Sequence, residues 1–364
     1  MRAQRLRTAA VMLAAVAAAP AATPALAAAG QPAHQHYYVA PGGDDTAAGT
    51  RGAPFATIQH ALDVAPGGAT VHLAAGTYRQ DAVTRRPGVT ITGPRAAVVR
   101  GGGAARIMQV QHDDTTLSGF TVDGLHGAAD QRDGYRDKLL YVMSTTPGDG
   151  VDGLRVLGMR LANAGGECVR LRYLITHAEV AFNDVGPCGV DDFVFAGGGK
   201  NGEAIYLGTA PEQQGANGAP DARPDVSRDN RIHHNHIDTR GNECVDIKEN
   251  STANTVEFNW CTGQQDPNSA GFDARGSGNT FRWNASIGNR GAGIRFGGDT
   301  AADGVDNDAY GNLIRGNAAG GIKFQATPQG RVCGNVMSDN TGGDAVGTYA
   351  GRYAPTAACD GWPV

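Results

Sequence analysis

Asparagine recurs at a regular spacing through the second half of the chain. Motifs of the form N-x-h-x-x-N, where h is an apolar or small residue, end at Asn235, Asn259, Asn284 and Asn312, and a related segment ends at Asn335. Successive closing asparagines are separated by 24, 25, 28 and 23 positions. A period in the twenties that recurs this often indicates stacked coils, because a single coil cannot bury its own apolar face. The repeat therefore predicts a solenoid.

The residues between the asparagines decide which solenoid is formed. Val, Ile and Phe alternate there with polar residues, whereas leucine-rich repeats need a Leu-rich consensus with helical segments. We therefore predict an all-β fold, a right-handed parallel β-helix of about ten coils. The asparagines are expected to stack at one corner, where their amides hydrogen-bond from coil to coil.

Residues 54–65 carry the pattern of a short amphipathic helix. Pro54 stands at the start, Phe55, Ile58 and Leu62 fall on one helical face, and a Pro-Gly-Gly stop begins at Pro66. A helix at this position would cover the open backbone edge of the first coil. We predict an N-terminal capping α-helix over residues 54–65.

The first residues read as a targeting segment. Arg2, Arg5 and Arg7 precede an alanine-rich apolar run that ends in Ala25-Leu-Ala27. This arrangement is typical of a secretory signal peptide, and the run is too short to span a bilayer. We expect a signal peptide at residues 1–27, followed by one secreted β-helix domain over residues 28–364 with no membrane segment.

The cysteines and the net charge indicate which cellular compartment and which class of binding partner the protein can have. The six cysteines have no CxxC spacing, and an even number in an exported chain favours disulfides over a metal site, although spacing alone does not fix the pairing. Without the three leader arginines, 28 Lys and Arg face 36 Asp and Glu. This acidic balance argues against a nucleic-acid partner, and we expect a monomer.

A second set of short segments lies between the asparagine corners and predicts one wall of the solenoid. Side chains alternate across a strand, so the residues between the apolar positions must point outward. The apolar column is Val169, Ile205, Val245, Phe272, Ile294 and Ile322. The first outward column is Arg170, Tyr206, Asp246, Asp273, Arg295 and Lys323. The next outward column contains Arg172, Lys248 and Arg275, and coils about 4.8 Å apart would place these groups within reach of one sugar.

Two parts of the sequence resemble known β-helix proteins. Residues 38–78, from Tyr-Val-Ala-Pro-Gly-Gly to Gly-Thr-Tyr, resemble the opening of pectate-lyase-like β-helix proteins. Residues 243–248, 272–277 and 291–295 resemble the chondroitinase B and alginate lyase family of polysaccharide lyases, in which acidic calcium ligands precede a catalytic lysine and a catalytic arginine lies on the next coil. The chain departs from that pattern at Gly241, where the family has a further acidic ligand.

The resemblance implies β-elimination at a uronic acid of an acidic polysaccharide. It makes Lys248 the base and Arg275 the partner of the substrate carboxylate or leaving oxygen, with Glu243 and Asp246 as ligands of Ca²⁺. Neighbouring cations are expected to lower the pKa of the base. The residues expected to bind substrate are Arg172, Glu203, Tyr206, Asp273, Arg295 and Lys323.

Other functions fit parts of the same wall. A glycoside hydrolase needs two carboxylates, which Asp246 and Asp273 could supply. A C5-epimerase is chemically close to a lyase, but the Asp-Pro-His signature of alginate epimerases is absent. A further alternative is a non-catalytic glycan-binding or surface protein of the same fold. Residues 187–228 interrupt the repeat, and we expect them to form a loop over the cleft.

Overall fold

The computed structural model describes residues 35–197 and 201–360. The chain divides into two units, residues 1–33 and 34–364, and the fold described below is that of the second unit. The signal peptide expected at residues 1–27 lies outside the described residues. Within the described ranges, none of the helices has the length and apolar character needed to cross a membrane.

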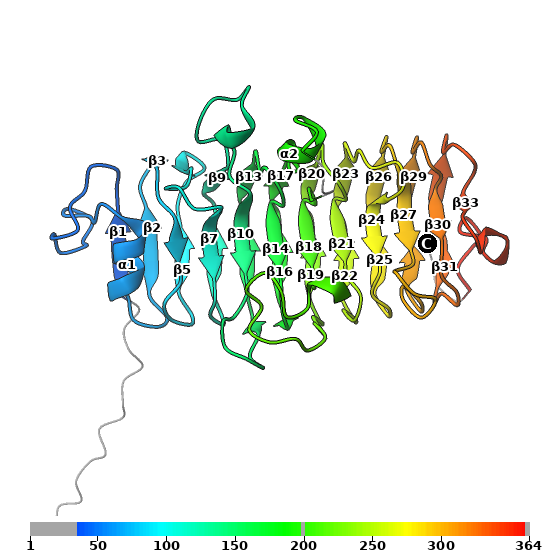
Figure 1. The fold of residues 1–364 in the computed structure, drawn as a ribbon, viewed down its shortest axis with the longest axis horizontal. Coiled ribbons are helices and arrows are strands. Elements are labelled where there is room, and N and C mark those ends of the chain that lie inside the picture. The colour runs from blue at the N-terminus through cyan, green and yellow to red at the C-terminus, as the bar shows by residue number, and fades with distance from the viewer. Residues whose placement is uncertain (1–34, 198–200, 361–364) are drawn as a thin grey trace, which may run out of the picture. The chain divides into compact units, whose positions relative to one another are not determined.

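The second unit is a right-handed parallel β-helix, as the repeat predicted, and Figure 1 shows its coils side by side. Sheet I consists of β1 (His36–Val39), β2 (Thr70–Leu73), β5 (Thr90–Thr92), β8 (Thr116–Ser118), β12 (Arg155–Leu157), β16 (Glu179–Ala181), β19 (Arg231–His233), β22 (Thr255–Glu257), β25 (Thr280–Arg282), β28 (Asp308–Tyr310) and β31 (Val332–Cys333). Sheet II consists of β4 (Ala82–Val83), β7 (Arg106–Val110), β10 (Lys138–Val142), β14 (Val169–Leu171), β18 (Ile205–Leu207), β21 (Val245–Ile247), β24 (Ala270–Ala274), β27 (Ala292–Phe296), β30 (Ile322–Phe324) and β33 (Ala345–Val346). Sheet III consists of β3 (Gly76–Tyr78), β6 (Ala97–Val99), β9 (Thr121–Asp123), β13 (Arg160–Ala162), β17 (Asp184–Val185), β20 (His236–Asp238), β23 (Trp260–Thr262), β26 (Ala285–Ile287), β29 (Leu313–Arg315) and β32 (Val336–Ser338). A further pair, β11 (Val151–Asp152) and β15 (Ile175–Thr176), extends the coils locally.

The corner asparagines form a hydrogen-bonded ladder along the coils. The side-chain amide of Asn235 donates to Asn259 Oδ1 at 2.9 Å, Asn259 donates to Asn284 at 3.0 Å, and Asn312 donates to Asn335 at 2.9 Å. The residues before these asparagines have a left-handed backbone, which places the side-chain amide toward the next coil. The repeated asparagines therefore have a structural role, because they hydrogen-bond neighbouring coils to one another.

The core is formed by the inward column of each sheet. In sheet II, Val169 pairs with Ile205, Ile205 with Val245, and Val245 with Phe272, and all four side chains are fully buried. Burying an aliphatic or aromatic side chain of this size stabilises the fold by roughly 1.5–3 kcal/mol. Three disulfides join sequential cysteines, namely Cys168–Cys188, Cys244–Cys261 and Cys333–Cys359.

The N-terminal cap is shorter than the sequence predicted. The helix α1 spans Ile58–Val64 instead of residues 54–65, because Thr57 accepts a hydrogen bond from the backbone N–H of His60 and starts the helix there. Phe55 is extended, since its backbone pairs with Tyr38 and Ala40 of the first coil. Ile58 and Leu62 are buried against the core, so the capping role remains.

The predicted excursion over residues 187–228 is in fact two segments, because β18 returns to sheet II in the middle of it. The first segment, residues 187–204, contains the short helix α2 (Val190–Phe193). The second, residues 208–228, contains the 3₁₀ helix η2 (Pro211–Gln213). The two segments flank sheet II at opposite ends of its strands (Figure 1). Two more 3₁₀ turns are η1 (Arg132–Gly134) and η3 (Ala350–Arg352).

Candidate functional site

The register of sheet II arranges the outward side chains in columns along the wall. Arg170 pairs with Tyr206, Tyr206 with Asp246, Asp246 with Asp273, and Asp273 with Arg295, which in turn pairs with Lys323. Two positions beyond Asp246 and Asp273, Lys248 follows β21 and Arg275 follows β24, and the N–H of Arg275 donates to the carbonyl of Ile247 at 2.9 Å. Lys248 and Arg275 therefore leave neighbouring strands at the same level.

A cavity of about 220 Å³ opens on this wall over β21, β24 and β27. Its lining consists of Glu203, Asn242, Glu243, Asp246, Lys248, Asp266, Asn268, Ser269, Asp273, Arg275 and Arg295. Seven of the ten predicted site residues lie here, whereas Arg172, Tyr206 and Lys323 do not. The sequence analysis missed Asn242, Asp266, Asn268 and Ser269, although the acidic and amide residues just before two wall strands were a usable signal.

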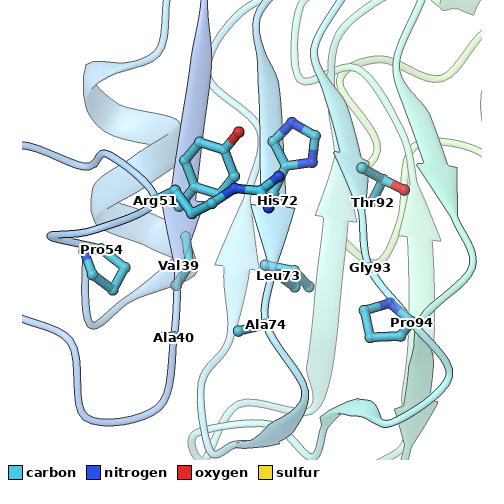
Figure 2. A pocket seen from close by; sticks show the side chains of 11 residues that line it. Val39, Ala40, Arg51, Pro54, His72, Leu73, Ala74, Thr92, Gly93 and Pro94 are labelled. Atoms are coloured by element: carbon cyan, nitrogen blue, oxygen red, sulfur yellow. The ribbon is translucent and has the colours of Figure 1, made fainter.

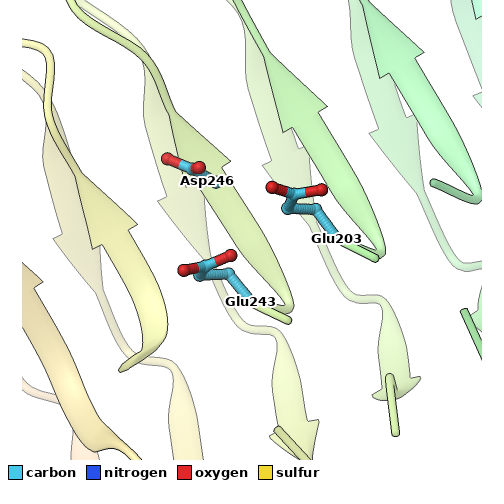
Figure 3. Close-up of side chains that lie close together, drawn as sticks. All are labelled: Glu203, Glu243 and Asp246. Atoms are coloured by element: carbon cyan, nitrogen blue, oxygen red, sulfur yellow. The ribbon is translucent and has the colours of Figure 1, made fainter. Parts of the chain in front are cut away.

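Three of the carboxylates that line the cavity lie close together, as Figure 3 shows. Glu203, Glu243 and Asp246 are buried, and each offers an oxygen within 4.8 Å of the others. Burial raises the pKa of Glu203 to about 7, and the charge of Glu167 acts in the same direction. Burial also raises the pKa of Glu243 well above its usual range, with further contributions from Asp246 and Glu203. The cluster is therefore short of positive charge.

Unpaired carboxylate oxygens in and beside this cluster show whether the site could bind a cation. Glu243 Oε2, Asp246 Oδ1 and Asp273 Oδ1 are buried and have no hydrogen-bond partner among the described residues. A buried polar atom left unpaired costs about 1–3 kcal/mol, and more if it is charged. Ca²⁺ binds carboxylate oxygens at about 2.4 Å, so ligand atoms on one ion lie within about 5 Å of each other. The residues present therefore fit a calcium ion.

Lys248 is paired with an acid, which contradicts the expected effect on its pKa. Its Nζ lies 2.7 Å from Asp246 Oδ2 and 4.7 Å from the centre of the Tyr206 ring. Burial lowers the pKa of Lys248, but Asp246, Tyr206 and Glu203 together outweigh it, and the pKa lies well above the usual lysine value. The expectation that neighbouring cations lower this pKa is wrong, because Arg275 contributes less than the acidic neighbours.

The arginines of the cavity are held by carboxylates. Arg275 Nη1 lies 2.8 Å from Glu249 and 2.6 Å from Asp299, and Arg295 Nη1 lies 2.7 Å from Asp273. About a quarter of the Arg275 side chain is exposed to solvent, so its guanidinium is accessible from the cavity. The ion pairs fix the position of both guanidinium groups.

The three predicted residues outside this cavity have other contacts. Arg172 donates to the Tyr141 hydroxyl at 3.1 Å and to the carbonyls of Gln213 and Ala216 at 2.8 Å, so it fastens the segment 208–228 to the wall. The buried Tyr206 ring lies between two cations: the guanidinium carbon of Arg170 is 3.4 Å from the ring centre, and Lys248 Nζ is 4.7 Å from it. Lys323 Nζ donates to the carbonyl of Asn268 at 2.9 Å.

Another cavity, of about 390 Å³, lies near the N-terminal cap (Figure 2). Its lining includes Tyr38, Arg51 and His72 together with small and apolar residues, and none of the described residues in the lining carries a carboxylate. It therefore lacks the combination of carboxylates with a lysine that the wall of sheet II brings together, and the candidate catalytic site is the cavity on sheet II.

Comparison with known families gives one match in sequence. A family described as a protein of unknown function, DUF1565, matches residues 41–93, which cover the cap and the first coils. No curated protein matches the sequence.

Solved structures match over most of the chain. The alginate lyase from Paenibacillus sp. str. FPU-7 has a TM-score of 0.59 at 18% identity, with 78% of this chain and 95% of the lyase covered. A rhamnogalacturonan lyase gives 0.50 at 14% identity, with 84% and 87% covered. The A-module of the Azotobacter vinelandii mannuronan C-5 epimerase AlgE4 gives 0.50 at 13% identity, with 84% and 95% covered. At these identities the likeness concerns the fold, and this chain shares the parallel β-helix of polysaccharide lyases.

Proposed function

We propose that this protein is a secreted, monomeric polysaccharide lyase that cleaves a uronic-acid-containing polysaccharide by β-elimination. The observation that carries the proposal is the meeting of Lys248 and Arg275, from neighbouring strands, in one cavity with the carboxylates Glu203, Glu243 and Asp246. The fold shared with polysaccharide lyases supports it. The partner is an acidic polysaccharide rather than a nucleic acid.

The reaction breaks the C5–H and C4–O bonds of a uronic acid and forms a C4–C5 double bond. The C5 proton becomes acidic only when the charge on the adjacent carboxylate is neutralised. Arg275 and Arg295 are the guanidinium groups that face the cavity, and they are positioned to hold that carboxylate. Calcium bound by Glu243, Asp246 and Glu203 would supply additional neutralising charge.

Lys248 is the one lysine among the described residues that line this cavity, and we assign the C5 proton to its Nζ. The leaving O4 must gain a proton as the bond breaks. Because the raised pKa keeps Lys248 as an ammonium, Nζ first passes a proton to Asp246, 2.7 Å away, and the free amine then takes the C5 proton. The Asp246 carboxyl gives its proton to O4, so both residues return to their charged forms. Arg275 is placed to stabilise the charge that develops on the carboxylate.

One observation favours a second candidate, a glycoside hydrolase. Asp246 and Asp273 are direct register partners on adjacent strands, and both line the cavity. A hydrolase needs one carboxyl as acid and another as base or nucleophile. Burial raises the pKa of Asp273, which favours a protonated carboxyl, whereas Arg295 at 2.7 Å stabilises the ionised form.

A panel of polyuronides tests both candidates. Alginate, pectate, glucuronan and glycosaminoglycans are incubated with the protein, and ultraviolet absorbance and reducing ends are followed. A lyase produces absorbance from the C4–C5 double bond, a hydrolase produces reducing ends without it, and a binding protein produces neither. Lys248→Met should abolish the absorbance change, whereas Arg315→Met, at an exposed cation on sheet III, should retain it. Absorbance from Lys248→Met at the wild-type rate would refute the assignment of the base.

A further inference from the structure

A second cavity, of about 330 Å³, lies on the same wall at earlier coils. It is built by β7, β10 and β14, and the segment 208–228 contributes Gln213 and Asn217 to its rim. None of its lining residues is shared with the candidate catalytic cavity. The two cavities are therefore separate places on one surface.

The charge of the second cavity is opposite to that of the first. Among the described residues, four cations line it, Arg106, Lys138, Arg170 and Arg172, against the two carboxylates of Asp137 and Glu167. The candidate catalytic cavity has three cations against five carboxylates. A polyanion is thus attracted to the second cavity by its own residues.

Three of the four cations are engaged inside the protein. Lys138 and Arg170 both pair with Glu167, at 2.5 Å and 3.0 Å. Arg172 is bound to Tyr141 and to the segment 208–228. Their charges still contribute to the potential of the cavity, but their N–H groups are largely occupied.

Arg106 differs from these three. Its guanidinium lies 3.6 Å from the centre of the Tyr141 ring, and among the described residues it has neither an ion-pair nor a hydrogen-bond partner. Stacking on an aromatic face fixes the plane of a guanidinium and leaves its edge free for two parallel hydrogen bonds to a carboxylate. Its side chain is half-buried, so this edge is open to solvent.

We propose that this cavity binds the carboxylate of a second uronic acid on the polysaccharide chain, with Arg106 as the residue that contacts it. This inference rests on the proposed function and adds a requirement for substrate length. Arg106 lies on β7 and Glu243 precedes β21, four coils further on in the sheet. At about 4.8 Å for each coil, the two places are about 19 Å apart, which one sugar ring cannot span.

Binding to an inactive chain tests the inference separately from catalysis. In a Lys248→Met background, titration calorimetry compares a long oligouronide with a dimer. Arg106→Gln should weaken binding of the long oligomer about tenfold, the loss expected for a charged hydrogen bond, and should leave the dimer unaffected. Arg106→Lys keeps the positive charge but cannot donate two parallel hydrogen bonds, so its affinity for the long oligomer should lie between those of the parent and Arg106→Gln. Arg315→Gln, on sheet III, is the matched control and should bind as the parent does.

The outcomes distinguish the inference from the proposed function. Unchanged binding of the long oligomer by Arg106→Gln overturns the inference, whether or not the protein is a lyase. Weakened binding together with no double-bond product from any polyuronide supports the cavity and refutes the lyase. If Lys248→Met does not fold, steady-state kinetics of the otherwise wild-type chain serve instead. Arg106→Gln should then raise KM for long polymers and leave kcat unchanged, and an unchanged KM refutes the inference.

Discussion

Lys248 and Asp246 form a buried ion pair two residues apart on one wall of the solenoid, with Nζ 2.7 Å from Oδ2. Because strand residues alternate, this i, i+2 spacing is what places both side chains on the outer face. The pair is enclosed by Tyr206 on one side and faces the cavity on the other. Asp246 therefore both holds the Lys248 side chain in place and favours its charged form.

Removing one partner of this pair should destabilise the protein. Lys248→Met leaves Asp246 beside the acidic cluster without its cation, and the expected loss in the free energy of unfolding is about 3–5 kcal/mol. The double variant Lys248→Met with Asp246→Asn should recover part of that loss, because no unpaired charge remains. Urea unfolding of the single and double variants measures the coupling. A double variant less stable than Lys248→Met would contradict the pairing.

Calcium should stabilise the protein through the three carboxylates. At a concentration 100 times the dissociation constant, a ligand that binds only the folded state adds about 2.7 kcal/mol. Thermal unfolding with calcium and with a chelator should therefore differ in Tm, and Glu243→Gln should reduce the difference. Glu257→Gln removes a buried acid of sheet I that has arginine partners and serves as the control, so it should keep the full calcium effect. Equal Tm values with calcium and chelator would exclude the site.

Glu257 gives a prediction for pH. Burial alone raises its pKa, but hydrogen bonds from Arg282 and Arg231 dominate and hold the pKa of Glu257 below the usual value of 4.5. An acid with a depressed folded-state pKa stabilises the fold above its unfolded pKa, and this contribution is lost as pH falls through the folded pKa. Glu257→Gln should thus lower Tm at neutral pH, and the difference from wild type should shrink as the pH falls below 4.5. A difference in Tm that does not depend on pH would contradict the assignment.

The coils of the solenoid and the side-chain columns on its wall could be predicted from the sequence. Val245, Asp246 and Ile247 alternate between apolar and polar as expected for a strand with one face in the core, and the asparagine period aligns that strand with its neighbours. The fold could be predicted because each coil repeats the same local pattern. The aligned columns also placed Lys248 beside Arg275.

Contacts between distant segments could not be predicted in the same way. The role of Arg172 depends on carbonyls of Gln213 and Ala216 in a segment with no repeat pattern. The pKa of Lys248 depends on which neighbours are nearest after burial, and composition alone does not rank Asp246 above Arg275. The start of α1 moved to Ile58 because Phe55 paired with the first strand, a tertiary contact that overrode the helical pattern.

The asparagine ladder should be a major source of stability in its interior. Asn284 Oδ1 accepts hydrogen bonds from the backbone N–H and the side-chain amide of Asn259, both at 3.0 Å, and its own amide donates to Val256. Asn284→Ala leaves the buried backbone N–H of Asn259 without this acceptor and also removes the hydrogen bonds with the Asn259 amide and the Val256 carbonyl, so a loss of about 2–4 kcal/mol is expected. Asn340 ends a parallel ladder and is only partly buried, so water can replace its amide in Asn340→Ala and the loss should be smaller. Guanidinium unfolding of both variants should show a lower midpoint for Asn284→Ala at an unchanged slope. Equal losses at the two positions would mean that the ladder contributes through each asparagine separately and that burial within it adds nothing.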